Sequence, residues 1–479
     1  MAALPVAGLL ASCAVGPNFV RPPAPGLTHY SHGADPTGTV IAGGTAQHVT
    51  AGASVATDWW HLFKSPDLDD TISEVLANNP GLDAAEASLR QSEDNLRSGY
   101  GIFYPQIGIG GGASRQLYSA VKVGQSAQSS LFNLFTLSAS ASYALDIFGG
   151  ERRALEALGA QVDIQRATER ATYVTLVANV VNTVVAAGAY RAEIDATKDL
   201  IDLQRQQLEL TQVQAQAGTV PYSTVLSVQS QLSSYEAQLP QLEQRLVQCN
   251  DLLASLAGRA PARWSPRRFD LAELNLPEVL PLTLPSDLVR QRPDILAAEA
   301  TAHAASASIG VATAALLPAV TLSGSYSASG TTTGSLFASS GRAWNAAGGI
   351  VAPVFEGGTL WFKRKAAIDS YEQAMALYQQ TVLAAFAQVA DVLSALEHDA
   401  LSLRAQEEAL QAAKTALRLV QVNYEAGLST YLDVMAADAQ YHQASINELQ
   451  AVAVRYQDTV ALYVALGGGW WITSGVPHD

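Results

Sequence analysis

The first residues that could carry chemistry form a short motif near the start of the chain. Leu10-Ala11-Ser12-Cys13 has a branched residue, two small residues and a cysteine, which is the pattern cleaved and acylated in bacterial lipoproteins. Cys13 is therefore predicted to be a lipid anchor, with a fatty acyl group such as palmitate, and residues 1–12 a signal peptide. No Lys or Arg precedes the apolar stretch, which a truncated or misassigned start would explain. The alternative is a chance cysteine in an apolar start.

Other reactive side chains do not assemble into a recognisable site. His29 and His32 are spaced like metal ligands but have no nearby cysteine or third ligand. Gly110-Gly111-Gly112 lies in a strand-like segment and does not open a helix, as a phosphate loop would. The paired carboxylates Asp69-Asp70 and Glu407-Glu408 are most simply solvated helix faces. We therefore predict a protein that is not an enzyme, with no cofactor and no metal site.

Charge and hydropathy narrow the class of protein further. Among 479 residues there are 28 Lys and Arg against 43 Asp and Glu, a net charge of −15. This excess of acid disfavours nucleic acid as a partner, because phosphate contacts need basic side chains. Hydrophobic residues make up 48% and charged residues 15%, yet no run of 18 apolar residues appears, so a membrane-spanning helix is not expected. A closed β-barrel would bury much apolar surface in a membrane without such a helix.

The chain repeats one plan twice. Four motifs recur in the same order at an almost constant offset of 209 to 213 residues, apart from a slightly shorter one at the third motif. An ordered set of this kind indicates an internal duplication. The matched pairs are Asn79–Ala87 with Arg292–Ala300, Tyr104–Ile107 with Leu317–Val320, Asp146–Gly150 with Val354–Gly358, and Ala217–Tyr222 with Ala426–Tyr431.

Each copy contains two segments in which apolar residues alternate with small polar ones. Residues 135–147 and 320–328 alternate most clearly, 107–113 is a weaker strand, and 344–354 is a fourth. The segment Gln116–Asn133, between the first two strands, is predicted to be a surface loop whose deletion would leave the assembly intact. The polar partners are Ser, Thr and Gly, and aromatic residues gather at the strand ends, a pattern typical of membrane barrels. Four strands cannot close a barrel, for which about eight is the practical minimum. The barrel must therefore be shared among subunits.

Very long helices are predicted after each pair of strands. The stretches 150–217 and 358–426 contain no proline, and 68 helical residues would reach roughly 100 Å. Each ends at Ala-Gly and is followed by a returning helix, Tyr222–Leu256 or Tyr431–Leu466, so coiled-coil hairpins are expected. The predicted divisions are a signal peptide (1–12), an extended segment (13–66), a first copy (67–257, with strands in 105–148 and helices in 150–256), a Pro-rich equatorial linker (258–285), a second copy (286–466, with strands in 318–355 and helices in 358–466) and a tail (467–479).

The order of these motifs resembles the TolC-type outer-membrane efflux proteins, in their NodT-like lipoprotein branch. Single motifs are weak evidence, but together they span residues 13 to 467 on a duplicated plan. The resemblance rests on Cys13 with Val15–Phe19 and Pro22-Pro23, on Trp59-Trp60, Phe63, Pro66, Leu68 and Asn78–Pro80, on Arg290–Asp294, and on Tyr424–Gly427 with Tyr431–Val434.

The resemblance implies a mainly α-helical fold with a membrane β part. It implies a homotrimer whose twelve-stranded β-barrel lies in the outer membrane and continues as a twelve-helix coiled-coil α-barrel in the periplasm. The partners would be outer-membrane lipid, a periplasmic adaptor (membrane fusion protein) and an inner-membrane pump of the resistance-nodulation-division type. The function would be efflux of small molecules or drugs, as in multidrug resistance. A type I secretion conduit is the nearest alternative, and a soluble coiled-coil pore-former a more distant one.

The resemblance also suggests functional residues at the two helical turns. Asp433, with Leu432 and Tyr424, would form a periplasmic gate in which three carboxylates act as an anionic filter. The alternative for Asp433 is an ordinary solvated acid. Two departures weaken the match, because Ala436 and Ser429 stand where some relatives have a second carboxylate and an arginine. The adaptor would dock at the turns themselves, at Gly218, Thr219, Gly427 and Leu428.

Overall fold

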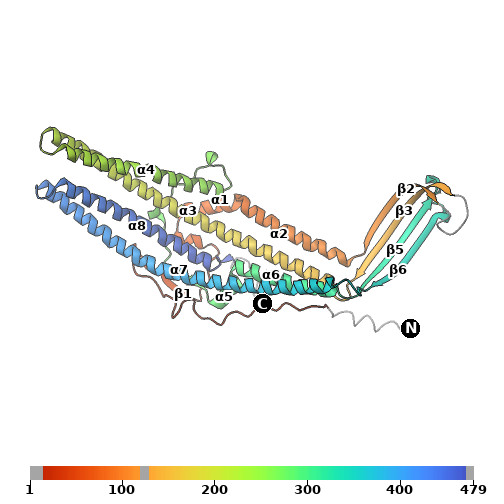
Figure 1. Ribbon diagram of the computed structural model, residues 1–479. Helices are drawn as coiled ribbons and strands as arrows, with labels where there is room; N and C mark the ends of the chain where they lie inside the picture. Colours follow the sequence, from red (N-terminus) through yellow and green to blue (C-terminus); the bar gives the residue numbers. More distant parts are fainter. Residues whose placement is uncertain (1–13, 119–128, 471–479) are drawn as a thin grey trace. The chain divides into compact units, whose positions relative to one another are not determined.

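The computed structural model describes residues 14–118 and 129–470. The predicted signal peptide, Cys13 and the end of the tail lie outside the described residues. The chain forms two compact units (Figure 1). The strand unit comprises residues 14–22, Ser88–Arg166 and Ala297–Tyr378. The hairpin unit comprises Pro23–Ala87, Ala167–Leu296 and residues 379–470.

The duplication seen in the sequence is present element by element. The two long helices each have 67 residues and the two returning helices each have 35. The returning helix of the first copy spans the predicted residues, and that of the second ends one residue earlier than predicted. In the first copy the elements are α2 (Pro80–Gly99), β2 (Gln106–Tyr118), β3 (Ser130–Leu145), α3 (Gly150–Gln216) and α4 (Tyr222–Leu256). In the second they are α6 (Pro293–Ala314), β5 (Ala319–Gly330), β6 (Arg342–Val351), α7 (Thr359–Glu425) and α8 (Tyr431–Ala465).

The four strands of the strand unit form one antiparallel sheet in the order β2-β3-β5-β6 (Figure 1). One row across the sheet consists of Ile109, Ala139, Tyr326 and Trp344. The neighbouring row is Gly108, Ser140, Ser325 and Asn345. Because successive side chains on a strand point to opposite faces, the sheet has one apolar face and one face of small polar residues. The predicted alternation is confirmed.

Two strand boundaries differ from the prediction. The segment Gln116–Asn133 was expected to be a surface loop. Residues 119–128 lie outside the described residues, but at its two ends β2 extends to Tyr118 and β3 begins at Ser130, with Gln116 opposite Phe132. Cross-strand pairing therefore continues past the point where polar Arg115 and Gln116 break the apolar pattern. Likewise β6 ends at Val351, before the predicted end at residue 354. Deleting the whole of 116–133 would remove paired strand residues, so it is not the harmless change that the sequence suggested.

The hairpin unit has a continuous apolar core. The Trp59 ring stacks on Tyr463 of α8, with centroids 4.9 Å apart, and Phe63 packs nearby against Tyr456. The N-terminal segment and the linker meet in a parallel pair of short strands, in which His48 lies opposite Val279. The smaller elements are β1 (His48–Ala51), η1 (Trp59–Phe63), α1 (Pro66–Asn78), η4 (Pro261–Arg263), η5 (Leu271–Glu273), β4 (Val279–Leu282) and α5 (Pro285–Gln291).

The expectation that no helix could span a membrane was too strict. Among the described residues, α3 and α6 each contain a stretch long and apolar enough to do so by length and composition. Scattered small and polar residues interrupt the apolar run without making the whole stretch polar. Most of the apolar stretch in α3 is buried within the chain, as in a core helix. Length and composition alone are therefore weak evidence for a spanning helix here.

Candidate functional site

The residues that follow Cys13 are fixed to the strand unit. We call residues 14–21 the N-terminal strap. The amide of Val15 donates a hydrogen bond to the carbonyl of Phe148, at the turn between β3 and α3 (2.9 Å). Gly16 has a φ of 92°, and a Cβ at this position would lie 2.5 Å from Cα of Gly310 in α6. Close backbone contact and a left-handed conformation therefore both require glycine at position 16.

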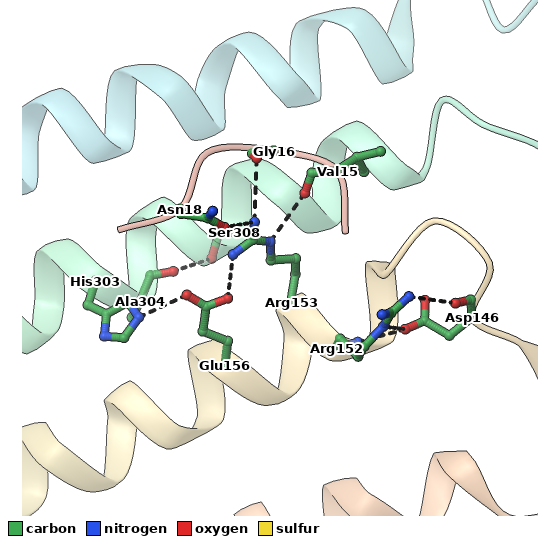
Figure 2. Close-up of polar contacts among 10 residues, drawn as sticks. All are labelled: Val15, Gly16, Asn18, Asp146, Arg152, Arg153, Glu156, His303, Ala304 and Ser308. Atoms are coloured by element: carbon green, nitrogen blue, oxygen red, sulfur yellow. Dashed lines mark hydrogen bonds and ion pairs between the residues drawn. The ribbon is translucent and has the colours of Figure 1, made fainter. Parts of the chain in front are cut away.

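Arg153 holds the strap from below (Figure 2). Its guanidinium donates hydrogen bonds to the carbonyls of Val15 and Gly16 (3.2 and 3.4 Å) and to Oδ1 of Asn18 (2.6 Å). The side chain is almost fully buried, and it also pairs with Glu156 at 2.7 Å. A buried guanidinium with this many acceptors is costly to remove, because each acceptor would lose its partner. Arg153 therefore fixes the path of the strap.

Glu156 links Arg153 to a second contact with the strap. Nε2 of His303, on α6, lies 2.9 Å from Oε1 of Glu156 (Figure 2). The ring of Phe19 stacks on the imidazole, with centroids 4.6 Å apart. Burial alone would raise the pKa of Glu156, but hydrogen bonds from Arg153 and His303 bring it below its ordinary value. The carboxylate is thus kept charged between two cationic or hydrogen-bonding partners.

The described part of the strap begins at Ala14, beside the turn after β3. A Cβ at Gly149 would lie 2.6 Å from Cα of Ala14, so Ala14 sits directly on the turn after β3. The sequence singled out Val15–Phe19 as a motif but did not reveal Arg153, Glu156 and His303 as its binding partners, because they are distant in sequence.

The second helical turn, between α7 and α8, contains the predicted gate. Gly427 has a φ of 73°, and its amide donates to the carbonyl of Tyr424 (2.9 Å). Thr430 and Asp433 form a capping box at the start of α8: Oδ2 of Asp433 accepts from the amide and the hydroxyl of Thr430 (2.8 and 2.7 Å). These hydrogen bonds lower the pKa of Asp433. Asp433 is exposed and ionised, but it also caps a helix, a role that neither sequence interpretation included.

The other predicted gate residues lie on opposite sides of this turn. The ring of Tyr424 packs edge-on against Tyr431, with centroids 5.7 Å apart, and therefore braces the turn from within. Leu432 and Leu428 are exposed large apolar side chains. Ser429 donates from its hydroxyl to the carbonyl of Val420 (3.1 Å). The turn thus presents two leucines and one carboxylate to its surroundings.

The first turn, between α3 and α4, has the same backbone and different side chains. Gly218 also has a φ of 73°, and Thr219 donates from its hydroxyl to the carbonyl of Gln214 (2.8 Å). Pro221 precedes α4, which has no side-chain cap. Both of the predicted Ala-Gly turns therefore close with glycine in the left-handed conformation.

The paired carboxylates are less free than the sequence suggested. Oδ1 of Asp69 lies 2.7 Å from His61, and Asp70 pairs with Arg267 at 2.8 Å. Oε1 of Glu407 accepts from the amide of Gly43 (2.8 Å). Each of these partners lies outside the helix that carries the carboxylate, so a helical pattern in the sequence does not reveal it. Within the described ranges, no group of three His, Cys, Asp or Glu side chains is placed to hold a metal ion.

Two further carboxylates, unmarked in the sequence, face each other between α7 and α8. Burial and the neighbouring carboxyl of Asp458 raise the pKa of Asp399 to about 7. Arg455 lowers it by a smaller amount. Two neighbouring carboxylates cannot both ionise without a cost in free energy. The pair is therefore sensitive to pH near neutrality.

Comparison with known proteins gives a consistent result. The family described as outer membrane efflux protein matches residues 71–259 and 284–468, which correspond to the two copies. The pyoverdine export outer membrane protein OpmQ of Pseudomonas aeruginosa is 32% identical over 437 residues, covering 88% of this chain and 90% of that protein. The probable outer membrane lipoprotein SilC of Salmonella typhimurium is 26% identical and covers 96% and 97%.

Solved structures share the fold across almost the whole chain. The outer-membrane channel OprN superposes with a TM-score of 0.85 at 25% identity, covering 96% of this chain and 100% of that one. The CmeC channel of Campylobacter jejuni has a TM-score of 0.88 at 20% identity and covers 95% of each chain, which shows the fold alone. The chain belongs to the outer membrane efflux protein family and is an outer-membrane channel protein of efflux systems, in a family of channels and not of enzymes.

Proposed function

We propose that three copies of the chain form one channel. The observation that carries this proposal is the four-stranded sheet. Every residue of its two edge strands, β2 and β6, is exposed, so each edge has unpaired backbone groups. In a membrane these groups must be hydrogen-bonded within protein, and four strands are too few to close on themselves. Pairing β6 of one protomer with β2 of the next closes a barrel of twelve strands with its apolar face toward lipid.

The helical hairpins would continue this barrel into the periplasm as a twelve-helix α-barrel. Equal lengths of α3 and α7, and of α4 and α8, support a pseudo-symmetric arrangement in which both turns reach the same level. The turns would then be where a periplasmic adaptor docks, at Gly218, Thr219, Gly427 and Leu428. An inner-membrane pump of the resistance-nodulation-division type would deliver the substrate.

The gate is proposed at the second turn. Three copies of Asp433 around one axis would gather three ionised carboxylates, and the exposed Leu432 would narrow the opening beside them. Tyr424 would act by bracing the turn through Tyr431. The capping box supports this role, because it holds the carboxylate in one orientation at the start of α8.

The proposed lipid anchor is Cys13, and the N-terminal strap supports this assignment. The strap brings the chain to the foot of β3, which is where an acyl chain would have to enter the membrane. The division of the chain into an N-terminal segment, two copies, an equatorial linker and a tail remains our interpretation.

Small molecules are the proposed cargo. The names of several relatives describe export of small molecules or ions: pyoverdine for OpmQ, toluene for TtgC of Pseudomonas putida and cations for CusC of Escherichia coli. These names favour efflux over the alternative of a type I secretion conduit for polypeptides. A soluble pore-former would not need a sheet with an apolar face and two open edges.

Membrane extraction and mass measurement test the proposal. The full-length chain should remain in the outer-membrane fraction after a salt wash, enter solution only with detergent, and have the mass of three chains once detergent is subtracted. The Cys13→Ser variant should lack the acyl mass at its N-terminus and still form the trimer. A monomer that stays in the aqueous fraction would refute the channel.

A further inference from the structure

The turn between β6 and α7 exposes several large apolar side chains in the strand unit. Val354 is 94% exposed and Phe355 88%. Trp361 and Phe362, in the first turn of α7, are 61% and 66% exposed. Together we call these four residues the turn patch. Large apolar side chains exposed together at one turn often mark a site of contact with protein or membrane.

The first copy of the plan shows that the patch lacks a cover. The equivalent turn after β3 contains Phe148, whose carbonyl accepts from Val15 of the strap, and Gly149, which lies against Ala14. The strap thus covers the first turn, whereas residues 354–358 receive no hydrogen bond from a distant segment of the described chain. An occupant from outside the chain is therefore needed to cover the turn patch.

Two lysines adjoin the patch. Lys363 and Lys365 are exposed, and neither has an ion-pair partner among the described residues. Arg364, between them, is half-buried and donates to the hydroxyl of Thr313 (3.2 Å). Both lysines lie in the second turn of α7, where no ion pair among the described residues accounts for them. In a chain with a net charge of −15, unpaired lysines beside aromatic rings suit an anionic, amphiphilic partner.

Trp361 and Lys365 are four residues apart and therefore lie on the same side of α7. Tryptophan rings favour the boundary between lipid and water, and basic residues next to that boundary attract anionic lipid. The patch also continues directly from β6, whose exposed Trp344 and Ile350 belong to the apolar face of the sheet.

We propose that the turn patch with Lys363 and Lys365 binds anionic phospholipid at the foot of the sheet. The rings contact the acyl chains and the ammonium groups contact the phosphate. This inference rests on the proposed function, because it requires the sheet to lie in the membrane. The proposed ligand is a phospholipid of the leaflet at the periplasmic end of the sheet.

The test is tryptophan quenching in phosphatidylcholine vesicles that contain the full-length protein. One-fifth of the lipid is brominated, either as phosphatidylglycerol or as phosphatidylcholine, and the Trp361 signal is the difference between the wild type and Trp361→Phe. Brominated phosphatidylglycerol should quench Trp361 more strongly. Each lysine contributes about fivefold to the local enrichment of anionic lipid. The double variant Lys363→Gln, Lys365→Gln should lose this preference, while Lys414→Gln, an exposed lysine farther along α7, should keep it.

Equal quenching by the two lipids in the wild type would overturn the inference. It would show that Trp361 lies in the bilayer but that the lysines do not recognise an anionic headgroup. No quenching by either lipid would also overturn it, because the patch would then be covered by another protomer. Conductance of the same vesicles separates this result from the proposed function. Vesicles that conduct without a lipid preference contradict the inference alone, and a preference without conductance contradicts only the channel.

Discussion

The two helical turns share one backbone but place their equivalent tyrosines differently. Gly218 and Gly427 have the same φ of 73°, and each turn leads into a helix that begins with tyrosine. Tyr222 is 68% exposed, whereas Tyr431 is 7% exposed and packs against Tyr424. The duplicated sequence thus preserves how the chain turns, while the side chains decide what each turn does. The first turn is an open surface, and the second is a braced structure that carries a carboxylate.

The largest expected effect comes from removing the brace. Tyr431→Ala should destabilise the protein by about 3–5 kcal/mol, the usual cost of truncating a buried aromatic side chain. Tyr222→Ala, the matched change at the first turn, should cost less than about 0.5 kcal/mol because its ring is solvated. Chemical unfolding of the detergent-solubilised protein, followed by circular dichroism, measures both. Equal losses would show that the two turns are braced alike.

The strand-to-helix turns extend the comparison to the other end of the helices. Arg153→Met should cost about 1–3 kcal/mol, because it leaves buried carbonyls of the strap and Glu156 without their donor. Trp361 stands three residues after the second glycine of the corresponding turn, as Arg153 does, and Trp361→Met should have little effect in detergent. The measurement is the same unfolding experiment, with limited proteolysis near residue 20 as a second readout. A strap that remains protected in Arg153→Met would contradict its role.

Alanine at the turn glycines should affect both turns equally. The left-handed backbone costs an alanine about 1–2 kcal/mol. A Cβ at Gly218 or at Gly427 meets no atom within 4 Å, so no clash adds to this cost. Gly218→Ala and Gly427→Ala should therefore lower the midpoint of unfolding to the same extent. A clear difference between them would mean that the two backbones are under unequal constraint.

A further difference between the two copies is the pH response of the second hairpin. Asp399 and Asp458 have Tyr190 and Cys249 as counterparts in the first hairpin, so the response belongs to one copy. The pKa of Asp399 rises from 3.8 in the unfolded chain to about 7 in the folded one. The folded state then binds more protons between these values, and stability falls as pH rises from about 4 to about 7. Titration of Asp399→Asn should show a flatter profile; an unchanged slope would assign the effect to other groups.

The sequence predicted regular features better than contacts between distant segments. The long helix α3 follows from a stretch without proline that ends at a glycine turn, which are local signals, and the serine alternation of β3 is local as well. The capping role of Asp433 has a local signal as well, because Thr430 stands three residues earlier. Arg153 and His303 could not be paired with the strap from sequence, because nothing in a charged residue specifies which remote carbonyl it will meet.

The second helical turn departs from the family pattern at two residues but keeps its own contacts. Ser429 and Ala436 stand where the resemblance led us to expect charged residues, yet the second turn is still held by the Thr430–Asp433 capping box and the Tyr424–Tyr431 contact. The proposed gate would depend on one carboxylate per protomer, so Asp433 is the residue on which the assignment is most directly tested.

Single-channel recording across a planar bilayer tests the central claim that the second turn is the gate. Wild-type trimers should prefer cations, and multivalent cations added on the periplasmic side should reduce their conductance, because three carboxylates bind them. Asp433→Asn keeps an acceptor for Thr430 but removes the charge, and should abolish most of the block. Thr430→Val removes the cap but keeps the charge, and should retain the block. If Asp433→Asn conducts with unchanged selectivity and block, the carboxylate serves only the helix cap and the gate lies elsewhere.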